Sequence, residues 1–253
     1  MSKILVTGGA GFVGTNLIIE LIKLGHEIVS IDNYSIGNKN NHQDGVKYVK
    51  GDIDNIEKLI ENDFNYCFHL AGLSRIQPSF NNPKETFYSN TQGTLKVLEW
   101  SRKNNTKVIY SGSSSKHHDP SISPYAMFKY LGEKICKLYK KTFKMRIEIV
   151  RFYNVYGPFE ILDGKWAALI GKWRGQIIRG ESLSIVGDGN QRRDFTHIKD
   201  IVDGIIKIGF SEHSHEDAWE LGTGVNYSIN QVYDMFNKFF NVSAEYIDNQ
   251  KGN

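Results

Sequence analysis

Residues 3–14 read Lys-Ile-Leu-Val-Thr-Gly-Gly-Ala-Gly-Phe-Val-Gly, and this stretch decides the fold. An apolar run ends in spaced glycines, Gly8, Gly11 and Gly14, and residues 15–24 then carry apolar side chains at helical spacing. The pattern predicts a strand, a glycine turn and a helix. Glycines permit positive φ and let backbone amides approach a pyrophosphate at the positive end of a helix. A tight turn without a ligand is the alternative.

A second predicted strand, residues 27–31, ends in Asp32. That position is close to the distance downstream at which an acidic residue holds the ribose hydroxyls of an adenine dinucleotide. A carboxylate there repels a 2′-phosphate, so NAD is favoured over NADP as the cofactor. Phe12 and Val13 at the turn and Asn33 beside the aspartate are further candidate cofactor contacts.

Predicted strands and helices continue to alternate along the chain. Further strands are expected at residues 46–50, 66–70, 107–110 and 146–151. With right-handed crossovers, this alternation predicts an α/β fold with a Rossmann-type, doubly wound parallel sheet. Ligands of such sheets bind at the carboxyl edge of the strands.

Candidate cofactor contacts follow two of these strands. Asp52, next to Ile53, either caps a helix or accepts a hydrogen bond from the adenine amino group. Leu70, Ala71 and Gly72 stand at the end of a strand, where small residues let a cofactor lie against the backbone.

Tyr125 and Lys129 lie four residues apart and can share one face of a helix. Free Tyr and Lys have pKa values of about 10 and 10.4. We expect the ammonium of Lys129, with a cationic nicotinamide nearby, to lower the pKa of Tyr125 so that the phenol serves as an acid/base. An ordinary amphipathic helix is the alternative. The serine run at residues 111–115 has two interpretations. It either forms a flexible turn or supplies the hydroxyl of Ser113 as a hydrogen-bond partner for the substrate oxygen.

The composition limits the possible partners. The chain has 253 residues, 40% hydrophobic and 23% charged, as expected for a globular protein with a sizeable core. Its net charge of +3 is small and its basic residues are dispersed, so no nucleic-acid partner is expected. The sequence shows neither a membrane-length apolar run nor a signal-peptide core, which predicts no membrane association and a cytoplasmic location.

Cysteine and histidine spacing predicts neither disulfides nor a metal site. Cys67 and Cys136 do not form a CxxC motif, so they are interpreted as packed thiols in a reducing compartment. The histidine pairs at 117–118 and 213/215 lack a third ligand in sequence, and loop histidines are the favoured interpretation.

The last hundred residues have a different pattern from the first 150. Helices are expected at residues 166–178, 201–208 and 229–240, and a strand at 183–186. We therefore expect an NAD-binding domain at residues 1–155 and a smaller mixed α/β substrate-binding lobe at 156–253, with segments of the lobe free to return to the first domain. The cleft between them is the expected substrate site.

Nine stretches, in order along the chain, resemble the extended short-chain dehydrogenase/reductase superfamily, and specifically its NAD-dependent nucleotide-sugar epimerase/dehydratase family. They are Thr7-Gly8-Gly-Ala-Gly11-Phe-Val-Gly14, Asp32-Asn33, Gly51-Asp52-Ile53, His69-Leu-Ala-Gly72, Asn90-Thr-Gln-Gly93-Thr94, Ser111-Gly-Ser113, Tyr125-Ala-Met-Phe-Lys129, Arg151-Phe-Tyr-Asn154-Val-Tyr-Gly157-Pro158 and Gly187-Asp-Gly-Asn-Gln-Arg-Arg193-Asp194-Phe195. The resemblance implies bound NAD, a nucleoside-diphosphate-sugar substrate and a homodimer formed through paired helices.

Roles for individual residues follow from this resemblance. It implies that Tyr125 is the acid/base, that Lys129 stabilises its anion and holds the nicotinamide ribose, and that Ser113 is the hydroxyl partner in contact with the substrate. Asn90 would line the nicotinamide side of the pocket.

The resemblance also assigns the substrate side of the cleft and the reaction. Asn154 and Arg193 match residues that hold the diphosphate of the nucleotide sugar, a role that suits a guanidinium. A surface charge is the alternative for Arg193. Dehydratases of the family carry an Asp-Glu pair after the serine or threonine, and decarboxylases usually carry a Glu, whereas this chain has Ser114 and Ser115. This favours 4-epimerisation by transient oxidation and re-reduction at C4. A 4-keto-sugar reductase, or another net oxidoreductase, and a non-catalytic NAD or nucleotide-sugar binding protein are the alternatives.

Two departures from the family pattern affect the substrate side. The segment between Ser113 and Tyr125 is shorter than the family's loop, so one wall of the sugar pocket is expected to differ. The chain ends at Asn253, about where the family has an arginine-containing substrate motif and further helices. The sequence is therefore expected to be either a truncated piece or a shortened natural form, and without that arginine weaker substrate binding is expected.

Overall fold

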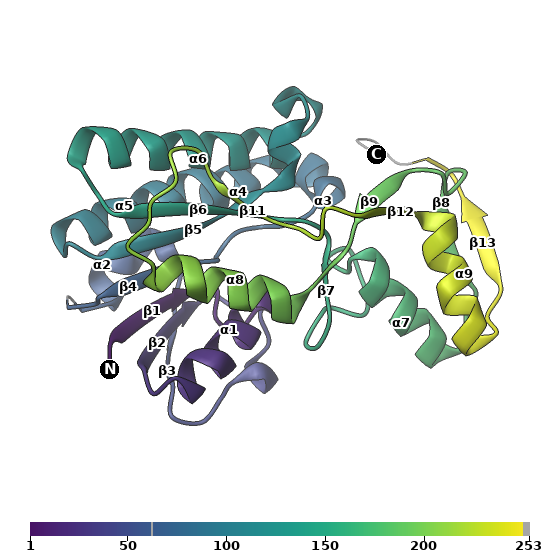
Figure 1. Ribbon diagram of the computed structural model, residues 1–253, viewed down its shortest axis with the longest axis horizontal. Coiled ribbons are helices and arrows are strands. Elements are labelled where there is room, and N and C mark those ends of the chain that lie inside the picture. Colours follow the sequence, from purple (N-terminus) through teal and green to yellow (C-terminus); the bar gives the residue numbers. More distant parts are fainter. Residues whose placement is uncertain (62, 250–253) are drawn as a thin grey trace.

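The computed structural model describes residues 1–61 and 63–249, and a seven-stranded sheet forms its centre (Figure 1). The strand order is β3-β2-β1-β4-β5-β6-β11, with every neighbouring pair parallel. The strands are β1 (Lys3–Thr7), β2 (Glu27–Asp32), β3 (Lys47–Lys50), β4 (Tyr66–His69), β5 (Lys107–Ser113), β6 (Ile147–Phe152) and β11 (Trp219–Leu221). The order runs outward in both directions from β1, which confirms the predicted Rossmann-type fold.

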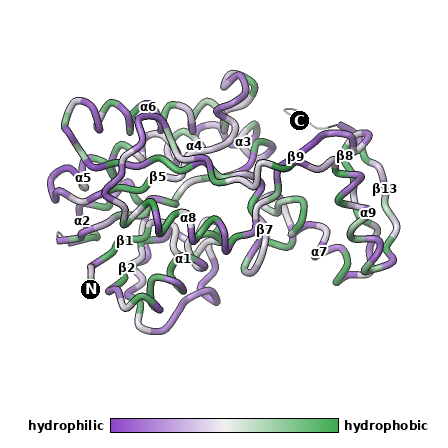
Figure 2. Tube along the Cα trace, in the orientation of Figure 1, coloured by the Kyte–Doolittle hydropathy of each residue, from purple (hydrophilic) through white to green (hydrophobic). Residues whose placement is uncertain are grey.

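Helices cover both faces of this sheet. One face carries α1 (Phe12–Lys23) and α8 (Ile198–Phe210), and the other carries α2 (Ile56–Leu59), α5 (Gly93–Lys103) and α6 (Pro124–Phe143). Leu17 and Ile201 are fully buried in the first core, and Trp100 and Cys136 are buried in the second. Hydrophobic and hydrophilic residues alternate along α8 in Figure 2, as expected for a helix with one face on a sheet. The sheet is therefore the middle of three layers.

A smaller group of elements lies beside this sheet, at the right of Figure 1. We call it the smaller lobe, and it comprises α7 (Leu169–Arg179), β8 (Leu183–Val186), β9 (Arg192–Asp194), β12 (Asn226–Ser228), α9 (Ile229–Phe240) and β13 (Ala244–Ile247). β8 pairs in parallel with β13. Trp173, Leu183 and Ile229 are buried there in a core of their own.

Short elements complete the chain. The pair β7 (Val155–Tyr156) and β10 (Thr196–His197) joins the two parts. The remaining segments are α3 (Ile76–Asn81), α4 (Pro83–Phe87), a π-helical turn (Tyr88–Gln92) and four 3₁₀ turns (Lys39–Asn41, Ile53–Asn55, Ser114–His117 and Pro120–Ile122).

β5 continues further than the sequence pattern predicts. It runs through Ser111 and Gly112 to Ser113 and pairs with β6, so these residues form no flexible turn. A Cβ at Gly112 would lie 2.6 Å from Oε1 of Glu133 on α6, so this glycine permits the close approach of that helix. Ser113 is therefore the last residue of a buried strand.

Three other features of the fold differ from the expectations. α1 begins at Phe12, directly after Gly11. β4 ends at His69, so Leu70 lies outside the strand. β11 was not predicted, because three residues are too few to show a period, yet it extends the sheet beside β6. Residues 250–253, at the end of the chain, lie outside the described residues.

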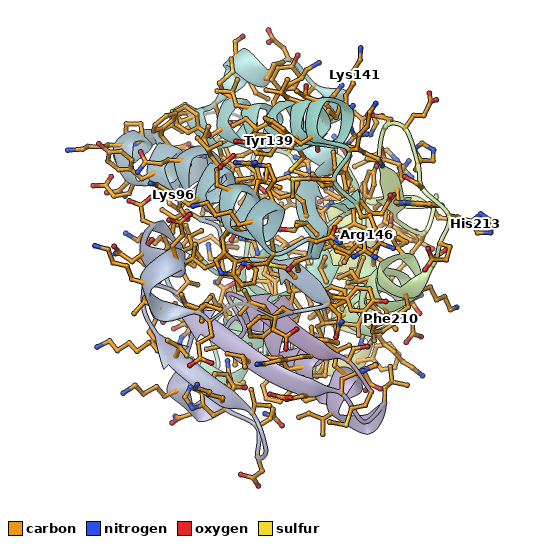
Figure 3. All side chains as sticks on the ribbon, turned by 90° about the vertical axis from the view of Figure 1, so that its left-hand side faces the viewer. Lys96, Tyr139, Lys141, Arg146, Phe210 and His213 are labelled. Atoms are coloured by element: carbon orange, nitrogen blue, oxygen red, sulfur yellow. The ribbon has the colours of Figure 1, made fainter. Side chains whose placement is uncertain are left out.

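Figure 3 shows the end of the molecule remote from the smaller lobe. Phe210, at the end of α8, stacks on His26 with ring centroids 4.9 Å apart and meets Tyr66 edge-on at the same distance. His213 lies in the exposed loop before β11. Aromatic contacts thus cover the edge of the sheet opposite to the strands' carboxyl ends.

The described residues offer neither a helix that could span a membrane nor a cluster of metal ligands. None of the helices in this part of the chain is both long and apolar enough to cross a bilayer. Across the same ranges, 1–61 and 63–249, no three His, Cys, Asp or Glu side chains gather in a way that would hold a metal ion.

Candidate active site

A cleft of about 1530 Å³ opens at the carboxyl edge of the sheet and extends to the smaller lobe. Every residue predicted to contact cofactor or substrate lines it, except Asn90. These lining residues are Gly8, Gly11, Phe12, Val13, Gly14, Asp32, Asn33, Asp52, Ile53, Leu70, Ala71, Gly72, Ser113, Tyr125, Lys129, Asn154 and Arg193. The fold therefore gathers residues from the whole chain around one cavity.

The glycine turn brings backbone atoms unusually close together at one end of the cleft. Gly8 has a φ of +73°, and a Cβ on it would lie 2.8 Å from the backbone nitrogen of Ala71. A Cβ on Gly14 would lie 2.3 Å from the carbonyl oxygen of Gly8. Only glycine fits these two positions without a shift of the backbone. The turn leads directly into α1 at Phe12, the arrangement that binds a pyrophosphate.

Asp32 is oriented by the same turn. Its Oδ2 accepts a hydrogen bond from the Ala10 N–H at 2.9 Å, and its Oδ1 accepts one from Tyr34 N–H at 2.8 Å. Burial raises the pKa of Asp32, and the two backbone donors oppose that rise. Each carboxylate oxygen has a second lone pair, so both are available to ribose hydroxyls.

Asp52 has both of its oxygens engaged. Oδ1 accepts from the backbone N–H of Asp54 at 3.0 Å and so caps the 3₁₀ turn that follows, while Oδ2 accepts from Nδ2 of Asn33 at 2.8 Å. The capping interpretation therefore applies. Because Asp52 also lines the cleft, contact with an adenine ring is a proposal that the cap does not exclude.

Three polar side chains meet where β5 ends. Tyr125 lies in the first turn of α6, and its Oη donates to Oγ of Ser113 at 3.3 Å. Lys129, one turn later, donates from Nζ to the carbonyl of Ser111 at 2.9 Å. Ser123 caps this helix by accepting from the Ala126 N–H at 3.1 Å. The phenol, amine and hydroxyl thus converge on one side of the cleft.

Burial is the main influence on the pKa values of both Tyr125 and Lys129. Burial raises the pKa of Tyr125, and the hydrogen bond with Ser113 and the charge of Arg75 oppose that rise. Lys129 is itself buried, which lowers its pKa to about 8. In the chain itself the burial of the phenol outweighs nearby charge, and Arg75 is the cation that acts on it. The lowering of the Tyr125 pKa by Lys129 together with a bound nicotinamide stays a prediction.

Asn90 lies behind the cleft rather than on its lining. It is fully buried in the π-helical turn, and its Nδ2 donates to the carbonyl of Leu73 at 2.9 Å. Its Oδ1 has no hydrogen-bond partner among the described residues, and a Cβ on Gly72 would lie 2.7 Å from that oxygen. Asn90 therefore supports the backbone at Gly72 and leaves one buried acceptor unused.

On the lobe side, Asn154 and Arg193 face the cleft from neighbouring segments. Asn154 has a φ of +27°, and its Nδ2 donates to the carbonyl of Asp194 at 3.0 Å. Arg193 donates from Nη1 to the carbonyl of Arg192 at 2.9 Å, which leaves its other donors for a ligand.

Arg75 and Glu160 also line the cleft and were not predicted. Arg75 follows Gly72 in the loop after β4, and its Nε donates to the carbonyl of Trp166 at 3.1 Å. Oε1 of Glu160 accepts from Nη1 of Arg174 at 2.7 Å, while no residue in ranges 1–61 and 63–249 donates to its buried Oε2. Burial raises the pKa of Glu160. The only signal for Arg75 in the sequence was a basic residue three positions after Gly72, in the loop that follows a predicted strand.

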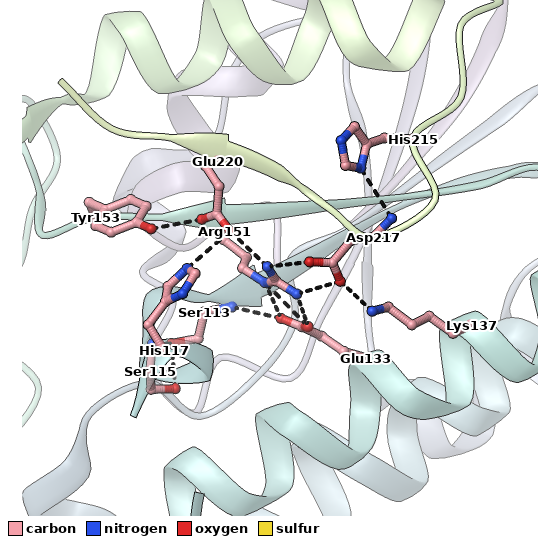
Figure 4. Close-up of polar contacts among 10 residues, drawn as sticks. All are labelled: Ser113, Ser115, His117, Glu133, Lys137, Arg151, Tyr153, His215, Asp217 and Glu220. Atoms are coloured by element: carbon pink, nitrogen blue, oxygen red, sulfur yellow. Dashed lines mark hydrogen bonds and ion pairs between the residues drawn. The ribbon is translucent and has the colours of Figure 1, made fainter. Parts of the chain in front are cut away.

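The buried side chain of Arg151 links β6 to α6 and β11 (Figure 4). Arg151 is 1% exposed and donates to Glu133 from Nε at 3.0 Å and from Nη2 at 2.7 Å. It also binds Asp217 at 3.0 Å and Glu220 at 2.7 Å. Burial acts to lower the pKa of Arg151, but the carboxylates raise it overall. Because Glu133 also accepts from the Ser113 N–H at 3.5 Å, this network links the end of β5 to α6.

These groups fit an adenine dinucleotide of the NAD type. The turn at Gly8 offers backbone amides next to a helix N-terminus, and Asp32 offers two oriented acceptors for an unphosphorylated ribose. Lys129 lies beside the unused acceptor of Asn90 at Gly72. The fit rests on the donor and acceptor sets that the fold itself assembles.

Comparison with known proteins gives concordant findings. The sequence model of the NAD dependent epimerase/dehydratase family matches residues 4–222. The solved UDP-N-acetylglucosamine 4-epimerase from Methanobrevibacter ruminantium M1, in complex with UDP-N-acetylmuramic acid, has 29% identity and a TM-score of 0.92 over 100% of this chain and 87% of that one.

Two further relatives differ in what they bind or do. MoeE5, solved with NAD and UDP-glucuronic acid, has 26% identity and a TM-score of 0.87 over 99% of this chain and 87% of its own, and it was also solved with UDP-glucose and NAD. The UDP-N-acetyl-alpha-D-glucosaminuronate decarboxylase of Bacillus cytotoxicus is 28% identical over 253 residues, 91% of this chain and 78% of its own length. A 4-epimerase and a decarboxylase are thus both similar to this chain.

Proposed function

The chain belongs to the NAD-dependent epimerase/dehydratase family, and from this premise we propose that it is an NAD-dependent nucleotide-sugar 4-epimerase. The observation that carries the proposal is the convergence of the Tyr125, Ser113 and Lys129 side chains in the cleft, with serine at both following positions. NAD, when bound, would accept a hydride from C4 of the sugar and return it.

In this proposal Tyr125 moves the proton of the C4 hydroxyl. Its phenolate takes that proton as the hydroxyl carbon is oxidised, and the phenol gives it back when the keto sugar is reduced. Oγ of Ser113 accepts from the N–H and the Oγ of Ser115, at 3.2 and 2.9 Å, and lies 3.3 Å from Oη of Tyr125, which as a phenolate no longer donates to it. With its acceptor sites engaged, Ser113 has its own O–H to donate to the substrate oxygen. Arg75 supplies positive charge that favours the phenolate, and Lys129 is proposed to add to it once the cationic nicotinamide is bound.

The residues after Ser113 support epimerisation over water loss or decarboxylation. Elimination needs a positioned acid and base beside the sugar, and neither Ser114 nor Ser115 carries a carboxylate. The hydroxyl of Ser115 instead bonds Ser113. The 4-keto sugar therefore has no partner at these positions for a further reaction and is reduced again, from either face.

Binding of the substrate diphosphate is proposed for Arg193 and Asn154. Arg193 has free guanidinium donors at the lobe side of the cleft, and a guanidinium matches phosphate oxygens in pairs. The sugar then reaches toward Tyr125, and the dinucleotide occupies the opposite end at Gly8.

The test is incubation of the protein with NAD and UDP-glucose, UDP-N-acetylglucosamine or UDP-glucuronate, followed by NMR of the sugar signals. We expect a mixture of C4 epimers and no net change in the absorbance of reduced cofactor. Stoichiometric formation of NADH would establish a net oxidoreductase instead, and loss of CO₂ from UDP-glucuronate a decarboxylase. NAD binding without conversion of any sugar would leave a binding protein.

We further propose a homodimer in a reducing compartment such as the cytoplasm. Leu95 on α5 and Leu138 and Phe143 on α6 are exposed by 37%, 57% and 47%, so adjacent helices present apolar side chains to a partner. Cys67 and Cys136 are free and buried, in keeping with the reducing compartment.

A further inference from the structure

Arg75 crosses the cleft in a backbone conformation that arginine rarely adopts. Its φ is +96°, a region that favours glycine. Its Nε donates to the carbonyl of Trp166, which belongs to the segment before α7 on the other side of the cleft. Strain of this kind persists only where surrounding contacts hold it, and it is often found at ligand sites.

The segment that carries Arg75 is fastened to Tyr125. Oγ of Ser79 accepts the backbone N–H of Tyr125 at 3.1 Å and donates to the carbonyl of Ile76 at 2.6 Å. Ile76 directly follows Arg75, and the guanidinium of Arg75 acts electrostatically on the phenol of Tyr125. Arg75 therefore lies at the end of the cleft where C4 of a sugar would react.

Position within the sugar limits what Arg75 can touch. In a pyranose ring, C1 and C4 lie opposite each other, so a diphosphate on C1 points away from the acid/base at C4. The substituents on C3 and C5 are both neighbours of C4, and in a hexuronate C5 carries the carboxylate. With C4 at Tyr125, Arg75 lies near these neighbouring substituents, and the proposed diphosphate ligand Arg193 lies on the lobe side.

The charges at this end of the cleft do not balance. Glu160 is the carboxylate that acts on Arg75, but its Oε1 already binds Arg174. Neither Nη atom of Arg75 forms a hydrogen bond or ion pair with any residue that the structure describes. Burial lowers the pKa of Arg75, so the charged form lacks full solvation here. A guanidinium with open donors and incomplete solvation favours an anionic partner.

We propose that Arg75 binds a carboxylate on the C5 substituent of the sugar, which makes nucleoside-diphosphate hexuronates the preferred substrate class. A carboxylate presents two acceptor oxygens and a charge to the planar guanidinium, whereas a hydroxymethyl group presents one neutral oxygen. The inference deepens the proposed function and rests on it for the orientation of the sugar.

Equilibrium binding to the NAD-loaded protein tests this, with UDP-glucuronate, UDP-glucose, UDP-N-acetylglucosamine and UDP as probes in calorimetry. Hydrogen bonds to charged groups contribute enough to change affinity by roughly 10- to 100-fold. We expect the unchanged protein to prefer UDP-glucuronate over UDP-glucose by about that factor. Arg75→Gln should abolish the preference and leave UDP binding as it was.

Two further variants separate the loss of the Arg75 guanidinium from misfolding and from a general effect of removing an arginine. Arg75→Gly removes the side chain and suits a φ of +96°, so it is expected to fold and to lose the same preference. Arg179→Gln is the matched control, because Arg179 is a lobe arginine paired with Glu181 on the surface. That control should keep the preference for UDP-glucuronate.

Several outcomes would overturn the inference. They are equal binding of UDP-glucuronate and UDP-glucose, tighter binding of UDP-N-acetylglucosamine, or an Arg75→Gln variant that weakens UDP as much as UDP-glucuronate, which would place Arg75 at the diphosphate. If neutral sugars are epimerised and uronates neither bind nor react, the proposed function stands and this inference fails. If no sugar is converted but the Arg75-dependent preference is found, the proposed function fails and the assignment of Arg75 stands.

Discussion

At the scale of single residues, the site depends on short side chains from β5 meeting longer ones from α6. Ser113 ends a buried strand, and Tyr125 and Lys129 occupy successive turns of one helix. Tyr125 and Lys129 were predictable because their spacing fixes one helical face. Arg75 was not predictable, because its role depends on a positive φ and on contacts with Trp166 and Tyr125 that no local pattern encodes.

Replacing Tyr125 with phenylalanine should remove the acid/base and keep the ring in place. General acid/base catalysis typically contributes about 10²- to 10⁴-fold, so we expect kcat for epimerisation to fall by roughly that factor. Tyr130→Phe is the matched control, because Tyr130 lies on the same helix but does not line the cleft. An unchanged kcat in the Tyr125 variant would remove the phenol from the mechanism.

His69 should make the protein sensitive to acid. Burial lowers its pKa to about 3, and its ring nitrogens bond Thr7 at 2.8 Å and Thr94 at 3.2 Å. A free histidine has a pKa of about 6.5, so between pH 6.5 and 3 the unfolded chain binds a proton that the folded chain excludes. The free energy of unfolding should therefore fall as pH falls through this window, by up to about 1.4 kcal/mol per pH unit from this residue.

Urea unfolding at pH 7 and pH 5 measures this effect. His69→Gln should lower stability at pH 7 but lose less stability between pH 7 and pH 5 than the unchanged protein does. Equal losses in the two proteins would show that His69 does not carry the acid sensitivity.

At the scale of elements, sequence patterns indicated every strand of the sheet except β11 and left several ends uncertain. β1, α1 and β2 were predictable from the glycine turn, because its positive φ and close backbone approach restrict which residue types fit there. The extension of β5 through Ser111 to Ser113 was missed, because a Ser-Gly-Ser run also suits a turn. It forms a strand through tertiary contacts with β6 and Glu133. Contacts between distant segments thus set the boundaries that local patterns leave open.

Arg151 should be important for holding these elements together. Removing one partner of a buried ion pair typically costs about 3–5 kcal/mol, because the other charge stays buried. Arg151→Met leaves the buried Glu133 without its partner, so we expect a loss of this size in urea unfolding. Lys103→Met, which breaks an exposed pair with Glu57, should cost about 1 kcal/mol or less. Similar losses in both variants would contradict this assignment.

At the scale of the whole molecule, one cleft joins the Rossmann sheet to the smaller lobe, and residues from position 8 to position 229 meet in it. The order of motifs along the chain allowed this site to be predicted, because parallel strands bring their carboxyl ends to one edge. Asn90 shows the limit of that reasoning. It belongs to a motif, yet the π-helical turn places it behind Gly72.

The proposed dimer is a property of the same scale. Light scattering after gel filtration should give twice the mass of one chain, and Leu138→Asp should give the mass of one chain, because a charge then replaces an apolar contact between α5 and α6 faces. Leu24→Asp is the control, since Leu24 is 55% exposed at the end of α1, on the other face of the sheet. A monomeric unchanged protein, or equal effects of both substitutions, would argue against this interface.

The central claim is that one C4 hydrogen leaves the sugar and returns to the same carbon. The most direct measurement uses UDP-glucose and UDP-glucuronate carrying deuterium at C4, incubated with the NAD-loaded protein and followed by NMR and mass spectrometry. The account predicts that at least one of them yields its C4 epimer with the deuterium still at C4. Epimer formed with loss of the label to solvent, or no epimer from either sugar while NAD is bound, would contradict it.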